Sequence, residues 1–258
     1  MPIALLREVA STFDRAIVSD PGRRPDVALA RKQHDGYARV LADAGFDVER
    51  IPADDDHPDS VFIEDTAVIV GSIAVVTRPG AAERRGEVGP VAEALQKKLP
   101  LARIEAPGTL DGGDVMIVGG RVYVGRSQRT NVAGIAQLET IAASQGMEVT
   151  TVPVRGVLHL KSAVLPVSDT TVVVTPDTVD EQLLSELTMV HEASHERHEF
   201  SAVRLGPNKV LVTASAPDTA GLVTEAGITT IPIDVSEIQA AVGGLTCMSI
   251  IYSTRTTQ

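Results

Sequence analysis

The sequence predicts an α/β propeller built from five blades. The first observation is a unit that recurs about five times along the 258 residues: two short β-branched strands joined by a turn, then a helix, then a strand with alternating apolar residues. The second is that paired strands are too frequent for a doubly wound sheet, in which single strands alternate with helices. Because repeated modules of short strands can close radially and leave no open sheet edge, we expect five pseudo-symmetric ββαβ modules in a ring.

The predicted hairpins are spaced regularly along the chain. Each joins two β-branched runs across a turn, and the last pairs the C-terminal run with the N-terminal one, which would close the ring. They lie at residues 66–70 with 74–78, 115–118 with 121–124, 163–167 with 170–175, 202–205 with 210–213, and 246–252 with 3–6.

Helices and closing strands complete the modules. Residues 26–44 carry Ala30, Tyr37 and Leu41 on one side of a helix, and residues 131–143 show the same period. A third helix is expected at residues 181–190, and the strand that should follow it is poorly defined. Closing strands are expected at residues 46–52, 101–106, 149–154 and 228–233.

Composition limits the class of protein. With 43% hydrophobic residues and no stretch resembling a linker, residues 1–258 are expected to form a single domain. No 18 apolar residues run together, and Arg7 and Glu8 come too early for a signal peptide, so a cytoplasmic protein without membrane contact is expected. The net charge of −11 and the lack of a basic run argue against a nucleic-acid partner and suit a cationic small molecule.

Cys247 is the first candidate for chemistry. As the only cysteine it can form neither an intramolecular disulfide nor a multi-cysteine metal site. It stands near two glycines at the entry to an apolar strand, although an isolated cysteine is more often a small core residue. A histidine that exchanges protons near neutral pH would make it a nucleophile. The candidate is His159, which lies in an apolar context before a hairpin, where a core histidine is again the more common case.

Carboxylates and arginines gather in other segments. Asp111 and Asp114 flank a glycine pair before a strand, a pattern that turn chemistry usually explains. Acids interrupt the strand-like residues 59–65, where buried carboxylates are costly unless a cation such as a guanidinium pairs with them. Arg84 and Arg129 each precede a helix and could each hold a substrate carboxylate, although solvated surface arginines are more common.

Six short segments that contain these residues share their order and spacing with one known family. They are PDSVFIED (58–65), RPGA (78–81), LDGGD (110–114), RTN (129–131), LHLKS (158–162) and GLTCMS (244–249). Together they resemble the dimethylarginine dimethylaminohydrolases of the guanidine-modifying superfamily, over nearly the whole chain. The resemblance implies a pentein-type five-bladed α/β propeller, which agrees with the repeats.

The resemblance also implies a reaction: hydrolysis of N-ω-methylated arginine, dimethylated or monomethylated, to citrulline and a methylamine. Cys247 would attack the guanidinium carbon, and His159 would protonate the leaving amine and then activate the water that resolves an S-alkylthiouronium intermediate. Asp111 would orient His159 or contact substrate, and Asp65 would bind guanidinium nitrogens. The substrate's charge would favour the thiolate, so the empty site should react slowly. Further implied substrate ligands are Ile17 on a mobile lid, Asp59, Glu64, Arg84 and Arg129.

The same resemblance implies no metal and no organic cofactor, and the partner it implies is a small molecule, with a homodimer as one assembly. One position departs from the pattern, because members often carry Asp five residues before the nucleophile and this chain has Val242. We expect the family to use the backbone carbonyl there for the substrate's α-amino group, in which case the change is harmless. If it uses the side chain, the change affects substrate choice.

A zinc hydrolase is one alternative. Residues 191–195 read H-E-x-x-H, a spacing that places two zinc-binding histidines on one helix face with the glutamate as base. Glu196 and Arg197 follow where a buried helix would need apolar residues, so residues 191–199 look like a charged, solvated helix end. Adventitious zinc, bound by these histidines or by Cys247 with His159, would inhibit.

Two further alternatives stay open. An arginine deiminase would use the same residues to release ammonia from unmethylated arginine, but such chains usually carry an added helical domain that this sequence lacks. A propeller that only binds ligands would not need a cysteine, a histidine and several acids at matching positions.

Overall fold

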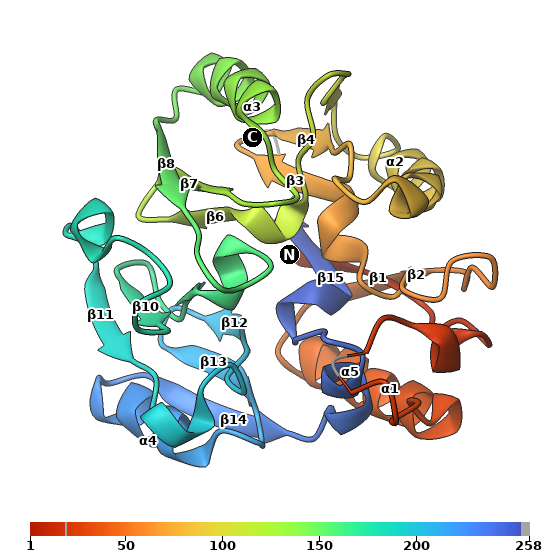
Figure 1. Cartoon of the computed structure of the whole chain (residues 1–258), viewed down its shortest axis with the longest axis vertical. Helices are drawn as coiled ribbons and strands as arrows, with labels where there is room; N and C mark the ends of the chain where they lie inside the picture. Colours follow the sequence, from red (N-terminus) through yellow and green to blue (C-terminus); the bar gives the residue numbers. More distant parts are fainter. Residues whose placement is uncertain (19, 254–258) are drawn as a thin grey trace.

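The structure, a computed structural model, describes residues 1–18 and 20–253 of the chain. Five three-stranded sheets surround a central axis, and the longer helices lie at the periphery (Figure 1). In every sheet the first strand is antiparallel to the second and the second is parallel to the third. This is the predicted ββαβ module, and the predicted five-bladed α/β propeller is confirmed.

The strands follow the predicted hairpins closely. Blade 1 contains both ends of the described chain, with Ile3 opposite Tyr252, so the ring is closed by pairing of the N- and C-terminal strands. The strands are, for blade 1, β15 (Ser249–Ser253), β1 (Pro2–Arg7) and β2 (Asp47–Ile51); for blade 2, β3 (Ala67–Val70), β4 (Ile73–Val76) and β5 (Leu101–Arg103); for blade 3, β6 (Val115–Val118), β7 (Arg121–Arg126) and β8 (Val149–Pro153); for blade 4, β9 (Val164–Pro166), β10 (Thr171–Val174) and β11 (Thr188–His191); and for blade 5, β12 (Ala202–Gly206), β13 (Lys209–Thr213) and β14 (Thr229–Ile233).

The helices are fixed by caps and by one apolar face. Helix α1 (Val27–Asp43) begins at Asp26, whose carboxylate accepts hydrogen bonds from the first turn, and it buries Tyr37 and Leu41. Asn131 caps α3 (Val132–Ser144) in the same way. The other α-helices are α2 (Val88–Leu95), α4 (Pro217–Glu225) and α5 (Ser236–Ala240). Among the described residues, none of the helices combines the length and apolar character needed to cross a bilayer.

The predicted helix at residues 181–190 is wrong. Blade 4 has only a 3₁₀-helix there, η6 (Glu181–Leu184), and the chain then enters β11, the closing strand that the sequence left undefined. Met189 lies opposite Val172 in a parallel pair with β10. Hydrogen bonding to the free edge of β10 therefore outweighs the local helical spacing, because strand formation depends on context more than on intrinsic preference.

Short 3₁₀-helices line the axis. Four of them end within one residue of the first strand of a blade: η2 (Ile63–Thr66), η4 (Gly112–Asp114), η5 (Leu160–Ser162) and η8 (Thr246–Met248). Helix η2 contacts both η8 and η4, and η4 contacts η5, so these turns from four blades meet in the middle of the ring (Figure 1). The remaining 3₁₀-helices are η1 (Phe13–Arg15), η3 (Ala82–Glu87) and η7 (Ser194–Glu196).

Candidate active site

The four central 3₁₀-helices carry most of the polar residues that the sequence singled out. Glu64 and Asp65 lie in η2, Asp111 directly precedes η4, His159 directly precedes η5, and Cys247 lies in η8. These residues are far apart in the sequence. The pseudo-symmetric repeat brings them together because each lies in, or directly before, the 3₁₀-helix that leads into the first strand of its own blade.

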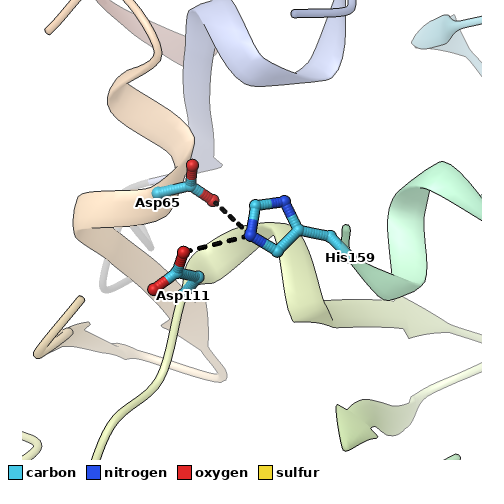
Figure 2. Close-up of side chains that lie close together, drawn as sticks. All are labelled: Asp65, Asp111 and His159. Carbon is cyan, nitrogen blue, oxygen red and sulfur yellow. Dashed lines mark hydrogen bonds and ion pairs between the residues drawn. The ribbon is translucent and has the colours of Figure 1, made fainter. Parts of the chain in front are cut away.

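Two carboxylates from different blades converge on one nitrogen of His159 (Figure 2). His159 Nε2 lies 3.0 Å from Asp111 Oδ2 and 3.9 Å from Asp65 Oδ1. Asp111 is fully buried and His159 is 7% exposed, so water screens these charges weakly. The arrangement therefore favours a protonated imidazole.

Gly113 permits this close approach. Its N–H donates to Asp65 Oδ1 at 2.9 Å, and a Cβ atom at this position would lie 2.6 Å from His159 Nδ1. A side chain here would push the imidazole away from both carboxylates. On the other side, the Gly80 N–H donates to Asp111 Oδ1 at 2.7 Å and fixes that carboxylate. The glycine pair beside Asp111 thus serves the site as well as the turn.

In this site the pKa of His159 is raised and the pKa of Asp65 is lowered. Burial alone would lower the pKa of His159, but the charge of Asp65, the hydrogen bond to Asp111 and the charge of Asp114 together raise it to about 9. Burial alone would raise the pKa of Asp65, but the charges of His159 and Arg84 lower it to about 2. At neutral pH the site therefore holds an imidazolium between carboxylates, which is the proton donor that a leaving amine requires.

Cys247 is a protonated thiol at neutral pH. It is half-buried, and its Sγ accepts a hydrogen bond from the Gly244 N–H at 3.3 Å. Burial and the negative charges of Glu64 and Asp65 raise the pKa of the thiol to about 12, although the Gly244 N–H and the charge of Lys161 oppose the shift. A cationic ligand among these carboxylates would favour the thiolate, so the site is arranged for activation by its own substrate.

Glu64 and Lys161 form an ion pair beside this thiol. Lys161 Nζ lies 2.5 Å from Glu64 Oε1, and both side chains are mostly buried. Burial raises the pKa of Glu64, and the Lys161 ammonium opposes that shift. Lys161 therefore offsets part of the negative charge that disfavours the Cys247 thiolate.

Lys161→Met should slow alkylation of Cys247 by iodoacetamide in the empty enzyme by roughly tenfold at about pH 9. Loss of the ammonium should raise the thiol pKa by about one unit, and each unit lowers the thiolate fraction about tenfold. Mass spectrometry can follow the reaction because the chain has one cysteine. Lys98→Met, which removes an exposed lysine paired with Glu49, is the matched control. Equal rates in the Lys161 and Lys98 variants would disprove the electrostatic role.

Arg84 lies inside the protein with its guanidinium already paired. Nη1 donates to Asp65 Oδ2 at 2.5 Å, and Nε and Nη2 donate to Glu87 at 3.0 and 2.7 Å. Nη2 also donates to the Phe62 carbonyl oxygen, and the residue is only 6% exposed. In the empty site Arg84 therefore orients Asp65. Its predicted contact with a substrate carboxylate stays a prediction and would require these bonds to rearrange.

Three other predicted substrate ligands, Asp59, Ile17 and Arg129, are at least partly exposed. The Ile17 N–H donates to Asp59 Oδ1 at 3.2 Å, which joins the segment predicted to be a lid to a predicted substrate ligand. The Ile17 side chain is 51% exposed, and burial raises the pKa of Asp59. Arg129 Nη1 lies 3.8 Å from Asp111 Oδ2, and the Arg129 side chain is 20% exposed. Substrate binding by these three residues stays a prediction.

Val242 ends α5 in a left-handed conformation. Its φ is +59°, which is unusual for a β-branched residue, and its side chain is half-exposed. The N–H groups of Val242 and Gly243 donate to the carbonyls of Gln239 and Ile238, the pattern of a Schellman cap in which glycine is usual at the Val242 position. This left-handed residue lies five positions before Cys247.

The H-E-x-x-H segment does not form a zincin helix. His191 ends β11 and His195 lies in η7, while the Glu192 carboxylate accepts hydrogen bonds from the Thr175 hydroxyl and the Phe200 N–H. The predicted charged helix end is therefore wrong.

Among the residues that the structure describes, two groups of side chains lie close enough for a metal to bridge them: Asp65 with Asp111 and His159, and His195 with Glu196 and Asp218. Hydrogen bonds and ion pairs account for the first group. In the second group both Glu196 oxygens accept N–H groups at the start of α4.

The sequence pattern explained Asp114 only as part of a turn and gave no role to Lys161 or Glu87, although all three belong to the site. Asp114 raises the pKa of His159 and accepts hydrogen bonds from Ser127, Thr130 and the Leu160 N–H. Asp114 and Lys161 lie within recognised blocks, where their position beside Asp111 and His159 was an available signal. Glu87, which pairs with Arg84, gave no signal because an acid three residues after an arginine is ordinary on a helix surface.

Comparisons with known proteins agree with this geometry. A family model described as "N,N dimethylarginine dimethylhydrolase, eukaryotic" matches residues 13–204. The N(G),N(G)-dimethylarginine dimethylaminohydrolase of Streptomyces coelicolor is 38% identical over 250 residues, 96% of this chain and 95% of that protein. Two solved dimethylarginine dimethylaminohydrolase structures each superpose with a TM-score of 0.91 at 31% identity, covering 96% of this chain and 98% of the other.

The first of these structures is a histidine-to-glycine variant in an adduct with S-methyl-L-thiocitrulline. The second is a cysteine-to-serine mutant of the Pseudomonas aeruginosa enzyme complexed with citrulline. Family model, sequence identity and fold all extend over most of the chain, as the six sequence blocks do. The chain belongs to the dimethylarginine dimethylaminohydrolase family.

Proposed function

We propose that this protein hydrolyses N-ω-methylated arginine to citrulline and a methylamine. The observation that carries the proposal is a buried imidazolium, His159, held by Asp65 and Asp111 in the same central cluster as the thiol of Cys247. Citrulline and S-methyl-L-thiocitrulline occupy the related solved structures, which supports a substrate with an arginine-like side chain.

Binding of the substrate would supply the missing positive charge. Its guanidinium would lie among carboxylates, with Asp65 accepting N–H groups, while Asp59 and Arg129 hold the amino-acid end and Glu64 and Ile17 support it. The added charge lowers the thiol pKa, and the thiol proton leaves to solvent. The thiolate then adds to the guanidinium carbon.

His159 would carry the remaining protons. The imidazolium, oriented by Asp111, donates a proton to the methylated nitrogen as the carbon–nitrogen bond breaks, leaving a cysteine S-alkylthiouronium. Neutral imidazole then takes a proton from the attacking water, and the tetrahedral adduct collapses to citrulline as its hydroxyl proton passes to the departing sulfur, which restores the thiol. Each turnover returns the imidazole to its protonated state.

The experiment that tests the proposal measures citrulline released from asymmetric dimethylarginine, monomethylarginine and arginine in parallel, with a chelator present. Turnover of the methylated substrates is expected, and Cys247→Ser should abolish it. Preference for arginine would instead assign deiminase chemistry. Lack of turnover with all three substrates would refute the proposal.

The domain organisation, the oligomeric state and the cellular location of the protein stay predictions. The described blades support a single catalytic domain, because the N- and C-terminal strands pair in the same sheet. A homodimer and a cytoplasmic location are expected from the sequence. Size-exclusion chromatography with light scattering, together with cell fractionation, would test both.

A further inference from the structure

Blade 5 brings a serine to the position where the other blades bring 3₁₀-helices. Within the described chain, blade 5 alone has no 3₁₀-helix that ends within one residue of its first strand, because η7 ends at Glu196 and β12 begins at Ala202. Ser201 stands there, immediately before β12, and it is only 9% exposed. Ser201 therefore occupies, in blade 5, the place before the first strand that the 3₁₀-helices occupy in the other blades.

The hydroxyl of Ser201 accepts a hydrogen bond from the segment that carries Cys247. The Leu245 N–H donates to Ser201 Oγ at 2.8 Å, and this bond is buried. Leu245 precedes η8, whose N-terminus has no side-chain cap of its own, so Ser201 caps it from another blade. The preceding N–H, that of Gly244, donates to Cys247 Sγ at 3.3 Å. Two consecutive N–H groups therefore have different acceptors: the Gly244 N–H donates to the nucleophile and the Leu245 N–H donates to Ser201.

Packing makes this contact rigid. A Cβ atom on Gly244 would lie 2.5 Å from Ser201 Oγ and 3.0 Å from Ser201 Cβ, so the loop lies directly against the serine. Ser201 is itself fixed, because its N–H donates to Thr213 Oγ1 at 3.0 Å and the Thr213 hydroxyl donates to the Glu199 carbonyl at 2.8 Å. The serine cannot shift without breaking bonds at the start of β12 and the end of β13.

We propose that Ser201 is a positioning residue for the nucleophile, holding the Leu245 N–H so that the neighbouring Gly244 N–H stays directed at the Cys247 sulfur. The proposal rests on the function proposed above for Cys247. Without the hydroxyl, the buried Leu245 N–H has no acceptor, and a buried unpaired donor is costly enough to make the loop turn elsewhere. Such a turn would also remove the one N–H that Cys247 Sγ accepts, and the thiolate would lose its donor.

Ser201→Ala should lower kcat for asymmetric dimethylarginine on the order of tenfold to a hundredfold and change KM less than about twofold, as a misplaced reacting group does. Alkylation of Cys247 by iodoacetamide in the empty enzyme should slow as well, and its pH profile should move to higher pH. Ser201→Thr keeps the oxygen and should restore most of both rates. Ser215→Ala removes an exposed hydroxyl of the same blade that bonds the Glu199 carbonyl, and it should change neither.

Two results would overturn the proposal. One is a folded Ser201→Ala protein with unchanged kcat and unchanged alkylation profile, which would leave the serine a purely structural role. The other is a folded Ser201→Thr protein as impaired as Ser201→Ala, because the oxygen would then not matter. Alkylation needs no substrate, so the comparison remains decisive even if the wild-type protein fails to hydrolyse methylated arginine. Circular dichroism melting establishes that each variant is folded.

Discussion

Replacing His159 by glutamine should lower citrulline production from methylated arginine by about 10²- to 10⁴-fold, the usual contribution of a positioned acid and base. Glutamine can still hydrogen-bond to Asp111, but it cannot carry the proton that the leaving amine needs. It also cannot take a proton from the water that resolves the intermediate. Steady-state rates would show the loss, and a single-turnover measurement would show which of the two steps it affects.

The same substitution should remove a pH dependence of stability. The pKa of His159 is raised from 6.5 to about 9 in the folded protein, since Asp65, Asp111 and Asp114 outweigh the opposing effect of burial. A raised pKa means that the folded state binds the proton more tightly. Its contribution is complete below pH 6.5 and is lost as the pH rises through about 9, to a total of at most about 3 kcal/mol.

Urea unfolding of wild-type protein and of His159→Gln at about pH 6 and about pH 10 measures this difference. The wild-type free energy of unfolding should fall more steeply across that interval than the variant's. His195→Gln is the matched control, because His195 is an exposed histidine that also pairs with a carboxylate, Asp218 at 2.9 Å. Equal slopes in all three proteins, or full activity of His159→Gln, would contradict the assignment.

Arg84→Met should lower the free energy of unfolding by about 3–5 kcal/mol. The guanidinium is the shared partner of two buried carboxylates, and its removal leaves Glu87 without an ion-pair partner among the described residues and Asp65 with His159 alone. The loss should be largest near neutral pH and smaller in acid, where protonation removes the charge. Adding Glu87→Gln to the variant should recover part of the loss, because one of the two buried charges is then absent. Urea unfolding would measure both the loss in Arg84→Met and its partial recovery in the double variant, as shifts of the midpoint with an unchanged dependence of the free energy on urea concentration.

Arg85→Met is the control for this variant. Arg85 is the neighbouring arginine, its Nε donates only to the Pro79 carbonyl oxygen, and its replacement should cost no more than about 1 kcal/mol. A contrary result would be an Arg84→Met protein of near wild-type stability whose KM for methylated arginine is strongly raised. That pattern would assign Arg84 to the substrate carboxylate, as the sequence predicted, instead of to Asp65.

Most of the fold could be predicted because each hairpin is a local pattern. Two β-branched runs across a short turn identify a strand pair without knowledge of distant residues, and five such pairs predict the ring. The exception is blade 4. Residues 188–191 become a strand only because β10 offers them an unpaired edge, and local spacing contains no information about that edge.

The site was predictable to the extent that its residues lie in recognisable blocks. Asp65, Asp111, His159 and Cys247 each stand next to a blade's first strand, where a repeat places them at the axis. Ser201 could not be found in this way, because nothing in its neighbourhood distinguishes it from an ordinary serine before a strand. Its importance lies in a contact with Leu245, which is 44 residues away in the chain.

By itself, the sequence determined the repeat, the ring closure by the N- and C-terminal strands, the sole cysteine and the family. These depend on periodicity and on residue identity, which a chain displays without folding. The tertiary structure alone decided which charges meet. It turned Arg84 inward to Asp65 and Glu87, paired Lys161 with Glu64, and gave His159 a raised pKa. Charge interactions in a buried site depend on distances of a few ångströms and on exclusion of water, and both exist only after the blades have packed together.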